Sequence, residues 1–357
     1  MRKVKLLVAI IFGLLAIISL IPSVKNKKIV LSENFIASEA QKVTSDCQKK
    51  LISQDCYIKD FLNLAKRYDA DFAKKVLSSI QSIDQSTNNC HTIAHSMARA
   101  VVEKDPSSWK KLIDKEDPNF CSGGFFHGII EAHAGFDNNF ALTGSQAQSL
   151  CSGGNNPLKE GSCKHILGHI IFVENRGDTE KAIQVCDDIK PPYEDECYGG
   201  IFMENVVRQN LKDHGLGIQY NWDIKYVNQT EELCVNQQNK AAKGCWGEMG
   251  HLYAAINNDD PQKTFGDCSR APKVEYRDNC YKLALFKIAI TADSQSKINT
   301  ACQVYNEGNL YNQCVSYMIN SFMQTSPSIK PRAESFCNSL LSSYQDDCLR
   351  RIGKINS

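Results

Sequence analysis

Residues 163–197, with the sequence CKHILGHIIFVENRGDTEKAIQVCDDIKPPYEDEC, contain the pattern that decides the fold. The apolar stretch that starts at Cys163 is as long as a typical helix, and an Arg-Gly-Asp turn at 176–178 ends it. The aspartate of this turn is a typical N-cap, so a second helix begins there, contains Cys186 and stops before the Pro-Pro pair. At Cys197 a new apolar stretch begins. The segment therefore predicts a helix, a turn and a second helix between two equivalent cysteines.

Equivalent cysteines recur along the chain with a nearly constant spacing. Each of these landmark cysteines opens an apolar stretch, and their successive spacings are 34, 31, 42, 34, 48, 35, 34 and 34 residues. They are Cys56, Cys90, Cys121, Cys163, Cys197, Cys245, Cys280, Cys314 and Cys348. A period of about 34 residues is typical of stacked helix pairs, and no stretch shows the sustained alternation of a strand. The pattern predicts an all-α fold, an α/α solenoid of about eight helix pairs over residues 47–357.

A second set of cysteines predicts disulfides between neighbouring repeats. Each member lies 9 to 12 residues before a landmark cysteine, which suits a bridge from the end of one helix pair to the start of the next. The predicted pairs are Cys47–Cys56, Cys151–Cys163, Cys186–Cys197, Cys234–Cys245, Cys268–Cys280, Cys302–Cys314 and Cys337–Cys348. Cys90 and Cys121 have no cysteine at this offset. Two interpretations stay open for them: a disulfide with each other, or a free or metal-binding pair.

The amino end and the cysteine content indicate an exported protein. Sixteen cysteines fit an oxidising compartment, because thiols in the cytosol are kept reduced. Basic residues at positions 2, 3 and 5 precede an apolar run over residues 6–21, and lysines at 25, 27 and 28 follow it. We expect a signal anchor over residues 1–28, a linker over 29–46 and a chain that faces the extracellular or periplasmic side. A cleaved signal peptide, and thus a secreted protein, is the alternative.

The charge balance and the missing motifs exclude several functions. Lys and Arg together number 41 against 40 Asp and Glu, and no basic stripe is present, so nucleic acid is not an expected partner. The sequence has no P-loop, no dinucleotide fingerprint and no G-x-S-x-G elbow, so we expect no nucleotide cofactor. Without C-x-x-C-H it has no site for covalent haem, and without H-E-x-x-H it is not a common zinc peptidase.

The histidines are clustered, and their spacing predicts a metal site. Six of the eight lie between positions 91 and 169. His91/His95 and His165/His169 each have the spacing H-x-x-x-H, which projects both imidazoles from one face of a helix. His127 lies on the helix between them, and stacked helices pack about 8–10 Å apart. A histidine pair with a third histidine from another helix is a ligand set for zinc, and it also suits copper or iron.

Further residues are candidates for the same site. His127, His169 and His251 all lie six residues after a landmark cysteine, and Met203 takes that position in the repeat after His169. A thioether there would favour copper, and His133 and Glu131 follow His127 on the same predicted helix. The alternative is structural: position six faces a packed helix junction, where a histidine simply donates a hydrogen bond to a carbonyl.

In period and layout, residues 47–357 resemble Sel1-like and tetratricopeptide-type repeats, especially the disulfide-rich secreted Sel1-like proteins of bacteria. The resemblance implies a concave surface that binds a peptide, a protein or a cell-wall fragment. Two repeats are longer than 34 residues, and insertions in solenoids are loops on one face. The longer insertion, residues 213–230, includes Asn228-Gln229-Thr230, an acceptor pattern for glycosylation.

Two functional hypotheses follow. The first is a membrane-anchored binding or scaffold protein with a metal site in the histidine-rich part, residues 90–175, and regular structural repeats over 245–357. The second is a metal-dependent hydrolase or oxidase that uses the same histidines. The sequence leaves open whether the protein is an enzyme.

Overall fold

The computed structural model describes residues 32–50, 53–84, 87, 90–117, 120–136, 143–151, 157–207, 224–304, 308–323 and 329–353. All regular elements within these ranges are helices, so the predicted all-α class is confirmed. The expected signal anchor, residues 1–28, lies outside them. In the described part of the chain, no helix has the length and hydrophobicity needed to span a membrane.

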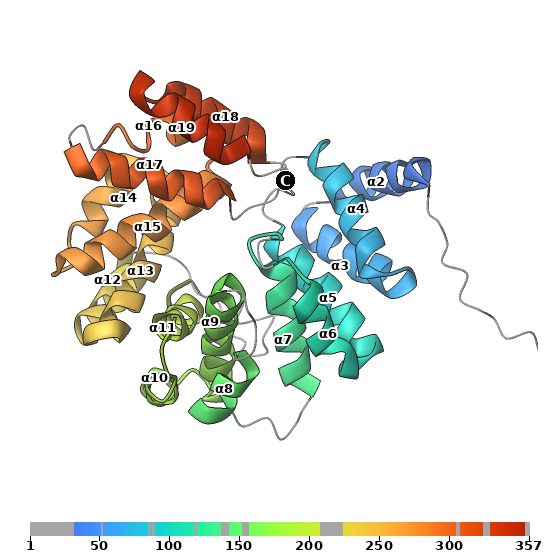
Figure 1. The fold of residues 1–357 in the computed structure, drawn as a ribbon, viewed down its shortest axis with the longest axis horizontal. Helices are drawn as coiled ribbons and strands as arrows, with labels where there is room; N and C mark the ends of the chain where they lie inside the picture. Colours follow the sequence, from blue (N-terminus) through green and yellow to red (C-terminus); the bar gives the residue numbers. More distant parts are fainter. Residues whose placement is uncertain are drawn as a thin grey trace, which may run out of the picture.

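The helices form two rows that alternate along the chain. Helices of the first row pack on one another in chain order, so that Figure 1 shows them following an open arc from α3 to α19. They are α3 (Ser53–Arg67), α5 (His91–Lys104), α7 (Gly124–Phe136), α9 (Pro157–Glu174), α11 (Asp195–Phe202), α13 (Asn239–Ile256), α15 (Val274–Thr291), α17 (Gly308–Met323) and α19 (Ser342–Ile352).

The second row provides the partner helix of each repeat. Its members are α2 (Glu33–Cys47), α4 (Ala70–Gln81), α6 (Trp109–Lys115), α8 (Gly144–Cys151), α10 (Thr179–Asp187), α12 (Ile224–Val235), α14 (Pro261–Cys268), α16 (Gln295–Thr300) and α18 (Lys330–Ser339). A 3-10 turn, Pro106–Ser108, precedes α6, and a π-helical turn, Met203–Val207, follows α11. The expected linker over 29–46 was wrong from Glu33 onward, because α2 buries Ala40 and Val43 in the core.

All sixteen cysteines form disulfides, and the seven predicted short-range pairs are confirmed. Cys90 and Cys121 also pair with each other, which removes the alternative of a free or metal-binding thiol pair. Each short-range bridge joins a second-row helix, or in the case of Cys302 the turn that follows one, to the next first-row helix. A disulfide of this kind stabilises a fold by about 2–4 kcal/mol.

Glycines let the backbones of first-row helices touch. A Cβ atom on Gly250 of α13 would lie 2.1 Å from the carbonyl oxygen of Cys280 on α15. On Gly168 of α9 it would lie 2.1 Å from the carbonyl oxygen of Cys197 on α11. No side chain fits at such distances, so these positions require glycine for packing and not for backbone conformation.

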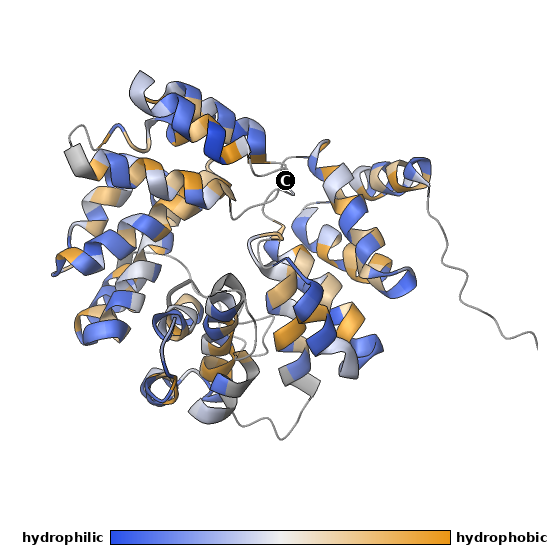
Figure 2. Cartoon of the chain, in the orientation of Figure 1, coloured by the Kyte–Doolittle hydropathy of each residue, from blue (hydrophilic) through white to orange (hydrophobic). Residues whose placement is uncertain are grey.

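The buried apolar residues form two cores that meet at α7. Phe125 and Ile129 belong to the amino-terminal core, whereas Phe126 and Ile130 belong to the carboxy-terminal one. Figure 2 shows α7 and α9 rich in hydrophobic residues and α18 mainly hydrophilic. Helix α7 is therefore the seam between the two halves of the fold.

Replacing a packing glycine should destabilise the protein far more than replacing an open one. We expect Gly250→Ala to lower the free energy of unfolding by about 1–3 kcal/mol, because the new methyl group overlaps α15. The control is Gly266→Ala in α14, where a Cβ meets nothing within 4 Å, and alanine favours the helix by up to about 1 kcal/mol. Urea unfolding of the oxidised protein measures both; equal effects would contradict the packing role.

Candidate metal centre

Helix α5 positions the first histidine pair. His91 is its first residue, and His95 follows one turn later. The Nδ1 atom of His91 lies 3.2 Å from the carbonyl oxygens of both Cys121 and Ser122, in the turn before α7. This turn has positive φ angles at Cys121 (52°), Ser122 (54°) and Gly123 (81°), and the Cys90–Cys121 disulfide ties it to the start of α5. The disulfide and the His91 hydrogen bond therefore hold the turn and α5 together.

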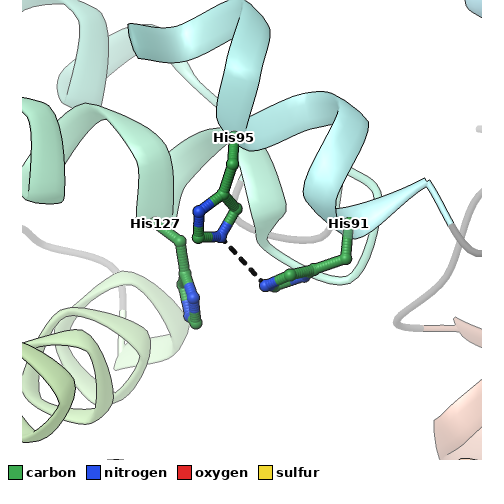
Figure 3. Close-up of side chains that lie close together, drawn as sticks. All are labelled: His91, His95 and His127. Carbon is green, nitrogen blue, oxygen red and sulfur yellow. Dashed lines mark hydrogen bonds between the residues drawn. The ribbon is translucent and has the colours of Figure 1, made fainter. Parts of the chain in front are cut away.

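Helix α7 supplies the central histidine, His127. It approaches α5 closely, because a Cβ on Gly124 would lie 2.3 Å from the His91 carbonyl oxygen, and one on Gly128 would lie 2.7 Å from the His95 Cα. His127 therefore lies beside the α5 pair, with its ring centroid 4.8 Å from that of His91 and 5.4 Å from that of His95 (Figure 3).

Helix α9 adds the second pair from the other side. The ring centroid of His127 is 5.7 Å from that of His165 and 5.3 Å from that of His169. The two H-x-x-x-H pairs and His127 thus form one cluster, here called the five-histidine centre: His91, His95, His127, His165 and His169. The structure brings together the five principal ligands expected from the sequence.

Acceptor groups lie within hydrogen-bond distance of the Nδ1 atoms of His91, His95 and His169, and a more distant carboxylate faces that of His165. Glu131 lies 3.0 Å from the Nδ1 atom of His95, and Glu204 lies 2.7 Å from that of His169. Glu196 lies 4.0 Å from the Nδ1 atom of His165, and backbone carbonyls face that of His91. An Nδ1–H that donates to an acceptor fixes the tautomer and leaves the Nε2 lone pair for a metal, as in many metal sites of proteins.

The inward nitrogens of the α5 pair can share a proton or a metal ion. The Nε2 atoms of His91 and His95 lie 3.0 Å apart, at hydrogen-bond distance (Figure 3), and the Nδ1 atom of each ring faces an acceptor. When both rings are neutral and donate from Nδ1, both Nε2 atoms carry lone pairs. Two lone pairs at this distance repel unless a proton or a metal ion lies between them. Tetrahedral ligands at Zn–N distances of about 2.0–2.1 Å are about 3.3 Å apart, so the pair fits a shared metal. The buried Nε2 of His169 has no hydrogen-bond partner within the described structure.

Charge in the cluster is controlled by burial and by neighbouring groups. Burial and the neighbouring His95 lower the pKa of His91 to about 3. Burial and the other imidazoles also lower the pKa of His127 and of His165 well below the usual value. For His169 burial acts in the same direction, but the hydrogen bond and charge of Glu204 outweigh it and raise the pKa. Most of the cluster is thus neutral at pH 7, the form that binds metals.

Two additional histidine candidates contact groups outside the centre. His133 stacks on Trp109 of α6, with ring centroids 4.2 Å apart. His251 pairs through its Nδ1 with Glu248 at 2.8 Å, and its ring lies 6.1 Å from that of Phe286. The third candidate, Met203, begins the π-helical turn, and the next residue, Glu204, contacts His169. A π-helical turn contains one residue more than an α-helical turn, so counting residues as in a regular α-helix does not predict the positions of the side chains in it.

The remaining surface prediction, the glycosylation pattern, does not lie in a loop. Asn228 is exposed on α12, and the hydroxyl of Thr230 is buried and donates to the carbonyl oxygen of Tyr226 at 2.8 Å. Residues 208–223 of the same insertion lie outside the described ranges.

Comparisons with known proteins gave no match. No family model matches the sequence, and no curated protein or solved structure is significantly similar to it.

Acid should destabilise the metal-free protein before its carboxylates titrate. His91, His127 and His165 have lowered pKa values in the folded state, so the unfolded chain binds more protons below about pH 6.5. Their stabilising effect is present above that pH and is lost as the pH falls towards their folded pKa values. The raised pKa of His169 acts the other way, but only above this window. Each group contributes up to about 1.4 kcal/mol per pH unit.

The measurement is the urea midpoint in the presence of a chelator at pH 7, 6 and 5. We expect a steady fall, and a smaller one for His127→Gln, which removes one of the three groups. A midpoint that stays constant over this range would contradict the assigned shifts.

Proposed function

We propose that this protein is an exported helical-repeat protein that binds a transition metal at the five-histidine centre. The observation that supports it most is the contact between the Nε2 atoms of His91 and His95, at 3.0 Å, with both Nδ1 atoms engaged by acceptors. The nearby His127 supplies a third nitrogen within 4.8 Å of both. A metal ion removes the repulsion between the lone pairs and satisfies all three rings.

The donor set favours zinc, copper or iron. Imidazole nitrogens suit these metals, whereas calcium and magnesium prefer oxygen ligands. Thiolate ligands are excluded because every cysteine is in a disulfide, including the pair Cys47 and Cys56 that lies near Asp60. The carboxylates of Glu131 and Glu204 face Nδ1 atoms, so they orient the rings rather than replace them as ligands.

Partial exposure of the centre supports a second candidate, a metal-dependent hydrolase or oxidase. The side chains of His95 and His165 are 21% and 20% exposed, so a small molecule can reach a metal bound there. However, Glu131, the carboxylate candidate on α7 that could act as a base on a metal-bound water, is engaged by His95. Binding is therefore the function that we favour.

The compartment and the membrane attachment of the protein are also part of the proposal. Eight disulfides fit an extracellular or secreted protein. We propose that the apolar run at residues 6–21 anchors the chain in a membrane, and that the stacked pairs act as a Sel1-like solenoid. Its partner is then a protein or a peptide on the concave face, as in other repeat proteins.

Metal content tests the proposal. The full-length chain is loaded with Zn²⁺ or Cu²⁺, desalted and measured by elemental analysis. We expect at least one ion per chain in the wild type and a loss of nearly all bound metal in the double variant His95→Ala with His169→Ala. The variant removes one ligand from each side of His127.

The matched control is His133→Ala, because this histidine stacks on Trp109 outside the centre. It should retain the wild-type metal content, and circular dichroism should show that all variants keep their helices. Equal metal content in the double variant and the wild type, or none in either, would rule out the proposed centre.

A further inference from the structure

His127 belongs to two sets of ligands at once. The nitrogens of His91, His95 and His127 lie within 4.8 Å of one another, and so do those of His127, His165 and His169. The ring centroid of His127 lies 4.8 and 5.4 Å from those of the α5 pair and 5.7 and 5.3 Å from those of the α9 pair. Each pair therefore needs the same third ligand.

The two pairs are built alike, although they lie on different helices. Each has the spacing H-x-x-x-H, and in each the second histidine places its Nδ1 against a carboxylate: His95 against Glu131, His169 against Glu204. Ring centroids within a pair are 4.7 Å apart on α5 and 4.8 Å apart on α9. Each helix thus presents two imidazoles to one side of His127. We call each pair a half-site, and the two half-sites can bind two ions rather than one.

His127 differs from the other four histidines in its surroundings. It is 7% exposed, and no residue of the described structure accepts or donates a hydrogen bond at its ring. Its neighbours are the four paired imidazoles, two on each side. An imidazole has two ring nitrogens, so one ring can serve two metals when both nitrogens are deprotonated.

We propose that the centre holds two transition-metal ions of the Cu²⁺ or Zn²⁺ class, bridged by the imidazolate of His127. One ion binds His91, His95 and one His127 nitrogen, and the other binds His165, His169 and the second His127 nitrogen. With metal–nitrogen bonds of about 2.0–2.1 Å, the ions lie about 6 Å apart. This inference rests on the proposed metal-binding function.

Binding of the two ions at His127 requires no redox chemistry. Neutral His127 releases its one N–H proton to solvent, two metal–nitrogen bonds form at this ring, and the metals keep their oxidation state. Each ion then has three protein ligands and retains a position for water, the pattern of reactive rather than purely structural zinc and copper sites.

Copper is the most informative probe, because two Cu²⁺ ions joined by an imidazolate couple their spins. The full-length chain is titrated with Cu²⁺ and desalted; bound copper is measured by elemental analysis and unpaired spins by electron paramagnetic resonance at liquid-helium temperature. We expect two copper ions per chain and fewer detectable spins than bound ions.

Two double variants remove one half-site each: His91→Ala with His95→Ala, and His165→Ala with His169→Ala. We expect each to retain one copper per chain, and every bound ion should then be detected as a spin. His133→Ala should behave as the wild type. Circular dichroism and intact disulfides confirm that each variant is folded, and the wild-type result does not depend on the variants.

The outcomes separate this inference from the metal-binding function itself. One copper per chain in the wild type, lost in both double variants, would overturn the bridged pair and leave a single-metal site. Two copper ions with a full spin count would overturn the bridge. No bound copper or zinc would overturn both the pair and the proposed function.

Discussion

Backbone contact between neighbouring first-row helices is the constraint on which the five-histidine centre depends. A Cβ on Gly124 or Gly128 would overlap the backbone of His91 or His95, and one on Gly200 would lie 1.9 Å from the carbonyl oxygen of His165. Each glycine thus lies opposite the backbone of a histidine on the adjacent helix, where there is no room for a side chain. With a larger residue, the helix axes would separate and the imidazoles would no longer share a ligand.

The turn before α7 is strained, and its surroundings hold it in place. Left-handed backbone at non-glycine residues costs about 1–2 kcal/mol each, and Cys121 and Ser122 both adopt it. The Cys90–Cys121 disulfide and the hydrogen bonds from His91 fix this conformation. Strained backbone of this kind is common at functional sites. Here the strained turn directs the carbonyl groups of Cys121 and Ser122 towards the Nδ1 atom of His91. The centre also lies at α7, the seam where the two apolar cores meet.

Much of the fold and of the ligand set was predictable because both depend on spacing. The cysteine period gave the repeats and all short-range disulfides, and H-x-x-x-H gave the two pairs that now flank His127. The glutamates that orient the rings were harder. Glu204 lies in the π-helical turn that follows α11, and Glu196, 4.0 Å from the Nδ1 atom of His165, belongs to the next repeat. Side-chain contacts across helices have no fixed offset in the sequence.

Two local errors have physical reasons as well. The expected linker was wrong because part of it forms α2, a second-row helix. No landmark cysteine precedes α2 in the sequence, so the cysteine spacing did not predict a helix there. Asn228 was placed in a loop because the insertion is long, but its last residues form α12, whose buried Tyr226 and Val227 pack in the core.

The order of the disulfides along the chain matters for how the molecule is made. Every disulfide joins two cysteines that are consecutive in the sequence, and even the longest loop, Cys90–Cys121, encloses no other cysteine. A chain that enters an oxidising compartment from its amino end can therefore join each new thiol to the one exposed just before it. The native connectivity forms in order of arrival, and no disulfide has to be broken and rearranged when the later repeats appear.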